Sequence, residues 1–285
     1  MKPVPTTAVL AAGAVLALAG CGSSSKHQTS ATTTLGNTPA PTTTASATAT
    51  APASNIASKS APQILASAEA ALSKVHSFHF QGVQNTTTGV ATITGEFALP
   101  GGFDVNLDQR GQTISLILAH GVAYFRASAS FWRSQSGANG AELAKLLANR
   151  WLSAGTSALP EVDQFVALTN PATVGRCVLG GKLGTLSVLG SSSVSGQPAI
   201  VLAAAADKPG TAPGRLYVAA TGQPLPLRIM QTGGYTKGVT TDPVCHTTPD
   251  TGKETSTVTL TDYNAPVTIA APAGAVSLAR LEKQG

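Results

Sequence analysis

The chain has 285 residues, of which 42% are hydrophobic and 11% are charged, and its formal net charge is +5. Residues 61–285 carry 15 Lys and Arg against 13 Asp and Glu, so this part of the chain is nearly neutral. The sequence has no stripe of basic residues interleaved with aromatic residues, so nucleic acid is not an expected partner.

Residues 1–20 have the pattern of a secretory signal peptide. Lys2 is followed by an uncharged apolar stretch over residues 9–19, which is shorter than the about 20 residues of a membrane-spanning helix. The stretch leads into a lipobox, Leu18-Ala19-Gly20-Cys21. We therefore expect cleavage before Cys21 and acylation of Cys21 with diacylglycerol and a further chain such as palmitate. Such acyl chains would anchor the mature protein to the outer side of the cell membrane. The alternative is an ordinary signal peptide with a chance cysteine.

Residues 21–60 form the predicted tether. Of residues 22–60, 29 of 39 are Ser, Thr, Ala or Pro, a composition that cannot bury enough apolar surface to fold. We expect a lipidated cysteine followed by a disordered linker, and one folded domain over residues 61–285.

The expected domain opens with a helix. Ser60 and Gln63 fit a capping box, and Pro62 fits the first turn. Apolar residues then recur at helical spacing from Ile64 to Val75.

Strands are predicted next, because apolar and polar residues alternate between 78 and 128, with glycine-rich turns between the runs. A second helix is expected over 141–152 and a third over 159–168, whereas 173–179 is ambiguous. Five further strands are predicted over 185–189, 199–205, 215–219, 225–231 and 256–262, with an extended piece over 267–269. The prediction is an α+β fold with a large curved antiparallel sheet of about 10 or 11 strands.

The alternation places several large apolar residues on one face of the sheet, opposite the opening helix. They either line a ligand cavity or form an ordinary core, and for each residue both interpretations remain open. The candidate cavity residues are Leu72, Phe97, Phe103, Leu107, Leu116 and Leu118.

Two cysteines remain once Cys21 is acylated. Outside the cytoplasm such a pair most often forms a disulfide, so we expect Cys177 to pair with Cys245. The alternative is a thiolate–imidazole site with His246.

No catalytic chemistry is expected. The chain has no G-x-S-x-G motif and no close pair of acidic residues suited to acid–base work. His76 and His79 are three residues apart, but on a strand they point to opposite faces, so no metal site and no cofactor are expected.

Several short segments resemble the LppX/LprG-type lipoproteins of actinobacteria. One is the C-terminal run Asp262-Tyr263-Asn264-Ala265-Pro266-Val267-Thr268-Ile269, followed by Pro272, and the resemblance lies in the order and spacing of all the segments. The runs 194–199, 215–218 and 221–228, together with Phe131-Trp132 and Arg150-Trp151, add to the resemblance. The chain departs from the family in two segments, residues 173–184 with Cys177 and residues 233–252 with Cys245.

The resemblance implies a half-barrel like that of the LolA/LolB-type carriers, with helices on the concave face and a hydrophobic cavity for acyl chains. It implies a lipoprotein that binds a lipid, glycolipid or lipoglycan for transport across the cell envelope, together with an envelope transport partner. The alternative is a structural or signalling lipoprotein with a solid core that binds a protein partner. Residues that would contact a ligand's head group are not predicted.

Overall fold

The structure is a computed structural model that describes residues 56–86, 89–135, 139–156, 162, 165–179, 183–238, 242–245 and 254–282. Cys21, the predicted signal peptide and most of the predicted tether lie outside the described residues, as does His246. Ile56 is the first described residue, and it is buried beside the first helix.

The fold is α+β, with one open sheet of twelve strands in the order β12-β6-β5-β4-β3-β2-β1-β11-β10-β9-β8-β7. All neighbouring pairs are antiparallel except β12 and β6, which are parallel. The strands are β1 Ser77–Thr86, β2 Gly89–Ala98, β3 Gly102–Gln109, β4 Gln112–Ala119, β5 Val122–Ala127, β6 Leu152–Gly155, β7 Leu186–Val194, β8 Gln197–Ala204, β9 Gly214–Ala219, β10 Pro226–Gln231, β11 Thr255–Thr261 and β12 Val276–Ser277.

Strands β1 to β5 are consecutive hairpins whose turns suit the sequence. Gly111 and Gly121 have positive φ angles of 74° and 77°, a conformation that glycine adopts without steric cost. The central pairing, between β1 and β11, instead joins segments far apart in the sequence, with Phe80 opposite Leu260. The two halves of the sheet therefore meet along β1 and β11.

The helices are short and few. Helix α1 (Ala61–Leu72) begins as predicted, with the Ser60 backbone N–H donating to Gln63 Oε1 over 3.0 Å. The others are α2 Ala129–Gln135, α3 Gly140–Leu147, α5 Val174–Leu179, α6 Leu278–Glu282 and the 3₁₀ turn η3 Ala167–Thr169.

The middle of the chain differs from the sequence prediction in the end of one helix and in the presence of another. Helix α3 ends at Leu147 instead of residue 152, because Asn149 adopts φ 59° and Leu152 begins β6. Helix α2 was not predicted, since Phe131 and Trp132 on it are consecutive and give no helical spacing.

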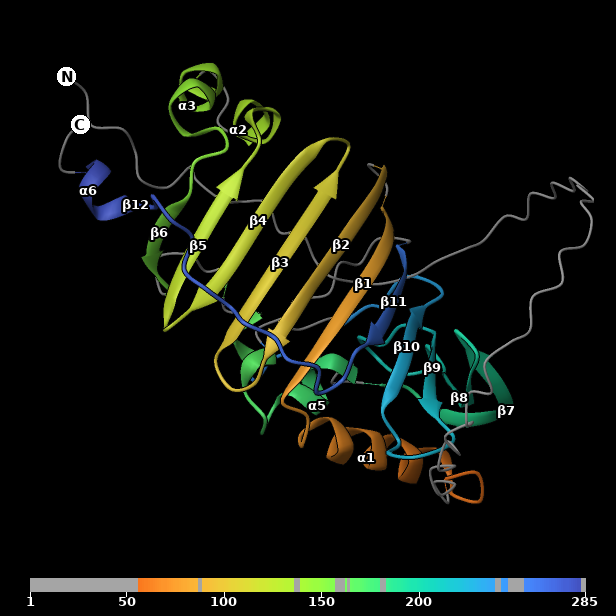
Figure 1. Ribbon diagram of the computed structural model, residues 1–285. Helices are drawn as coiled ribbons and strands as arrows, with labels where there is room; N and C mark the ends of the chain where they lie inside the picture. The colour runs from red at the N-terminus through yellow and green to blue at the C-terminus, as the bar shows by residue number, and fades with distance from the viewer. Residues whose placement is uncertain are drawn as a thin grey trace, which may run out of the picture.

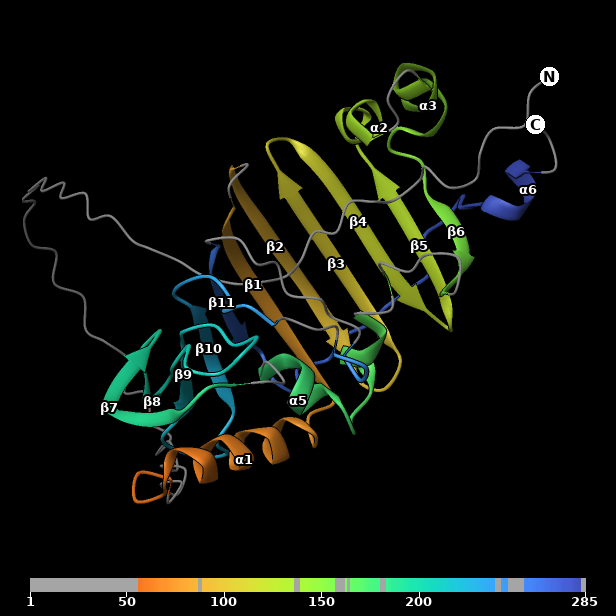
Figure 2. The ribbon, with the colours of Figure 1, turned by 180° about the vertical axis from the view of Figure 1, so that it is seen from behind.

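Helices lie on the concave face of the sheet, which we call the inner face. Helix α5 stands in front of the strands in Figure 2 and behind them in Figure 1. Helix α1 buries Ile64 and Ala68 against Ile200, Leu202 and Val218 of the other half of the sheet. The predicted curved sheet with helices on its concave face is confirmed, as an open sheet of twelve strands.

The opposite, outer face is crossed by residues 263–272, which we call the C-terminal strap (Figure 1). The predicted extended piece over 267–269 belongs to this strap and is not paired as a strand. The Asn264 backbone N–H donates to the Ser77 carbonyl over 2.9 Å, and Gly102 is so close that an added Cβ would lie 3.3 Å from Ile269 Cβ. Half-buried and exposed residues alternate along the strap, so it lies on the sheet like an unpaired strand.

Candidate functional site

The inner face carries one continuous line of apolar residues across nine strands. Adjacent members are directly opposite one another in the strand register, so they share one face of the sheet. In sheet order this apolar row is Leu202, Leu216, Ile229, Val258, Gly82, Ile93, Leu107, Ile114 and Ala127.

Part of this apolar surface remains accessible to solvent. Leu107 and Ile114 on β3 and β4 are only half-buried, and so are Leu216 and Ile229 on β9 and β10. Phe80, one row closer to α5, is half-buried as well. The middle of the inner face therefore presents large apolar side chains that the helices do not cover completely.

The structure brings the six candidate cavity residues together in one apolar cluster. Leu72, Phe97, Phe103, Leu116 and Leu118 are buried in it, whereas Leu107 is half-buried at its margin. Of the six, Leu107 is therefore the one whose side chain is partly accessible to solvent, whereas the other five are buried.

The end of the inner face near α5 is tightly packed. Aromatic rings lie in series, with centroids 4.9 Å apart for Phe78 and Phe97, 5.8 Å for Phe97 and Phe103, and 5.4 Å for Phe103 and Phe165. Phe165 comes from the segment before η3 and lies on the sheet from the helical side. At this end the side chains of the sheet and of its cover interdigitate as in an ordinary core.

Toward the opposite end of the strands the inner face becomes polar. Two residues beyond the apolar row on each strand, about 7 Å away, lies a second row that we call the amide row. Its polar members, in sheet order, are Gln231, Ser256, Gln84, Gln109 and Gln112. Ala91 stands between Gln84 and Gln109 in the same register.

Hydrogen bonds hold the glutamine side chains of the amide row in place, and the acceptor of one of these bonds is a buried glutamate. Gln84 Nε2 donates to Glu254 Oε2 over 2.7 Å, and Glu254 is only 5% exposed. Gln231 Nε2 donates to the Gly233 carbonyl over 2.9 Å. Ser256 is fully buried between these two glutamines, and its hydroxyl has no hydrogen-bond partner among the described residues.

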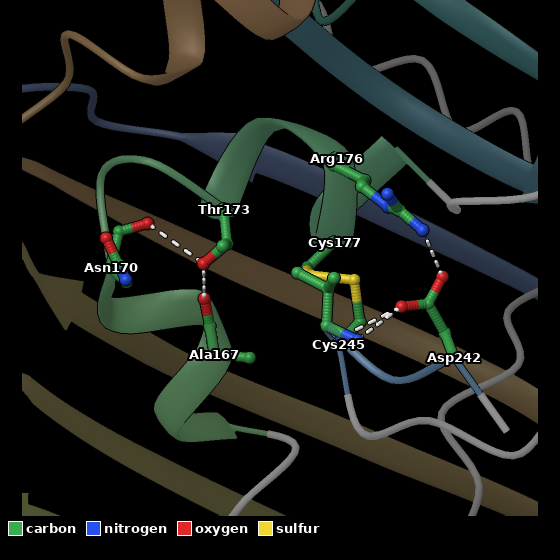
Figure 3. Close-up of a disulfide and its surroundings, with 8 residues drawn as sticks. Ala167, Asn170, Thr173, Arg176, Cys177, Asp242 and Cys245 are labelled. Atoms are coloured by element: carbon green, nitrogen blue, oxygen red, sulfur yellow. Dashed lines mark hydrogen bonds and ion pairs between the residues drawn. A yellow bond between two sulfur atoms is a disulfide. The ribbon is translucent and has the colours of Figure 1, made fainter.

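Cys177 and Cys245 form a disulfide with a Cα–Cα distance of 5.3 Å, as the sequence analysis predicted (Figure 3). It links α5, on the inner face, to the connection between β10 and β11. Arg176 Nη2 also donates to Asp242 Oδ2 over 2.8 Å in the same place. Burial would raise the pKa of Asp242, but hydrogen bonds from Arg176 and the backbone N–H groups of Cys245 and Val244 hold that pKa below its ordinary value.

Tyr263 closes the packed end of the site at the start of the strap. Its hydroxyl donates to the Pro226 carbonyl, and its ring centroid lies 6.2 Å from that of Phe78. Burial raises the pKa of this phenol well above its ordinary value, because the ionised form would lose its hydration. The Tyr263 side chain therefore stays neutral and is held in place by its hydrogen bond and its contact with Phe78.

Sequence reasoning missed the amide row and Phe165. Gln84, Gln109 and Gln112 occur at the ends of predicted strands, where polar residues are ordinary, and only the register aligns them.

Within the described part of the chain, no three His, Cys, Asp or Glu side chains gather as a metal site requires. None of the described helices is both long and apolar enough to cross a membrane.

No protein-family profile matches the chain, and no curated protein does. Among solved structures it is similar to LprF from Mycobacterium bovis, at 15% identity over 75% of this chain and 97% of that one, with a TM-score of 0.45. It is also similar to the Mycobacterium tuberculosis lipoprotein LppX, at 12% identity over 73% of this chain and 99% of that one, with a TM-score of 0.44. Both are of the LppX/LprG type that the sequence motifs resemble. A LolA superfamily protein from Nitrosomonas europaea matches at 12% identity over 74% and 96%, with a TM-score of 0.24.

Proposed function

We propose that this protein is a lipid-binding lipoprotein of the cell envelope that holds acyl chains against its inner face and acts without catalysis. The observation that carries the proposal is the apolar row, which continues across nine strands and stays half-exposed at Leu107, Ile114, Leu216 and Ile229. A continuous apolar surface that is exposed to water is rare in a soluble protein and usually marks a binding site.

Acyl chains suit this surface because they are long, flexible and uniformly apolar. Covering the exposed parts of these side chains stabilises a complex by about 25 cal/mol for each Å² of apolar area removed from water. Two acyl chains would thus contribute several kcal/mol without any specific polar contact.

The proposal includes a role in transport. An acylated Cys21 at the end of a tether would keep the domain near a membrane surface while leaving the inner face free to take up and release lipid. Transfer to another membrane or carrier would then involve an envelope partner protein that docks near the open part of the inner face.

The test is native mass spectrometry of the exported full chain carrying Cys21→Ala, purified without detergent. We expect a mass increment that disappears on organic extraction, with the extracted compound identified as a lipid. Uptake of the apolar dye 1-N-phenylnaphthylamine, displaced by added lipid, is the companion measurement.

A bare protein mass together with no dye uptake would overturn the proposal. That result would favour the alternative function, a lipoprotein with a solid core that binds a protein partner. The tight series Phe78, Phe97, Phe103 and Phe165 shows that one end of the inner face is packed in this way.

A further inference from the structure

The inner face is amphipathic along the strands. From the row of Phe97 and Phe103, near α5, to the amide row, each of β1 to β4 advances by six residues, a span of about 20 Å. Three successive rows along this span are apolar, and the fourth is made of glutamine and serine, with Ala91 as its one apolar member. A lipid has the same polarity along its length, with apolar chains and one polar end.

We propose that the amide row is the subsite for the head of the bound lipid, and that it takes a head that carries hydroxyl groups. This inference rests on the proposed function. It fixes the direction of the ligand, because the acyl chains extend from the amide row toward α5 and Phe165.

The unpartnered hydroxyl of Ser256 points to a ligand group. A fully buried hydroxyl without a hydrogen bond is rare, because its desolvation is uncompensated. Ser256 lies directly opposite Gln84 on one side and Gln231 on the other, so the three side chains are on the same face of the sheet. A ligand hydroxyl placed there would supply the missing partner.

The test uses two probes with the same C18 acyl chain, monooleoylglycerol and methyl oleate. Binding to the delipidated Cys21→Ala full chain is measured by displacement of 1-N-phenylnaphthylamine. We expect monooleoylglycerol to bind about 10-fold more tightly than methyl oleate, the gain of one or two well-made hydrogen bonds.

The variant Ser256→Ala separates the head-group contact from the stability of the fold. It removes a hydroxyl that has no described partner, so we expect an unchanged melting temperature but loss of most of the preference for monooleoylglycerol. The matched control is Ser187→Ala on the exposed strand β7, which should not change this preference.

The outcomes distinguish this inference from the function beneath it. If the two probes bind equally and Ser256→Ala changes nothing, the amide row is not the head-group subsite although the protein binds lipid. If neither probe binds, the proposed function fails as well.

Discussion

Leu107 and Leu116 point to the same face from neighbouring strands, yet their surroundings differ. Alternation along the sequence placed both on the apolar face correctly. It did not distinguish the buried Leu116 from the half-buried Leu107, because that difference depends on what covers each residue. The cover includes Phe165 and the short helical segments that follow it, whose position on the sheet leaves no local pattern in the sequence.

This difference predicts opposite effects for the same substitution. Leu107→Trp extends an indole over the open part of the inner face, so we expect a nearly unchanged melting temperature and about 10-fold weaker lipid binding, the loss of about two buried methylene groups. Leu116→Trp overpacks a filled core and should lower the free energy of unfolding by about 1–3 kcal/mol. A fluorescent fatty-acid titration and a thermal melt of both variants measure the two effects. Two equally destabilised variants would mean that Leu107 also lies in a solid core.

At the scale of elements, hairpins were the most predictable part of the fold and the helical middle was the least. Strands β2 to β5 follow one another with glycine turns, so local alternation is enough to locate them. Helix α5 has only six residues, Val174–Leu179, and is too short to show helical periodicity. It needs a tertiary anchor, and the disulfide from Cys177 to Cys245 provides one on the side facing the β10–β11 connection.

Removal of this disulfide should therefore be costly. The two cysteines are 68 residues apart, and a closed loop of that length stabilises the folded state by about 4 kcal/mol in the chain-entropy model. We expect the double variant Cys177→Ser, Cys245→Ser to lose about this much in urea unfolding. A reductant should destabilise the wild type similarly and leave the double variant unaffected. A reductant that weakens both proteins equally would show that the effect does not come from this bond. The neighbouring Arg176–Asp242 pair is half exposed at the arginine and adds little.

For the whole molecule, the decisive feature is that the two halves of the sheet meet at β1 and β11. The pairing places Gln84 beside Glu254 although 170 residues separate them. No local pattern specifies such a partner, and so the sequence predicted a large curved sheet without its strand order. The amide row and the buried Glu254 arise from this long-range pairing, which is why the sequence did not predict them as a group.

The mature protein should have two independent parts, the anchor at Cys21 and the domain that begins near Ile56. Two or three acyl chains on Cys21 would bind a membrane stably, since each buried CH₂ contributes about 0.8 kcal/mol. We therefore expect Cys21→Ala to move the protein from the detergent phase to the aqueous phase in phase-partitioning experiments. Its melting temperature should match that of the wild-type protein in detergent, because the described hydrophobic clusters are built from Ile56 and later residues. Ser25→Ala, in the same segment but outside the lipobox, is the control and should remain in the detergent phase. A Cys21→Ala protein that stays in the detergent phase would show that another part of the chain holds it at the membrane.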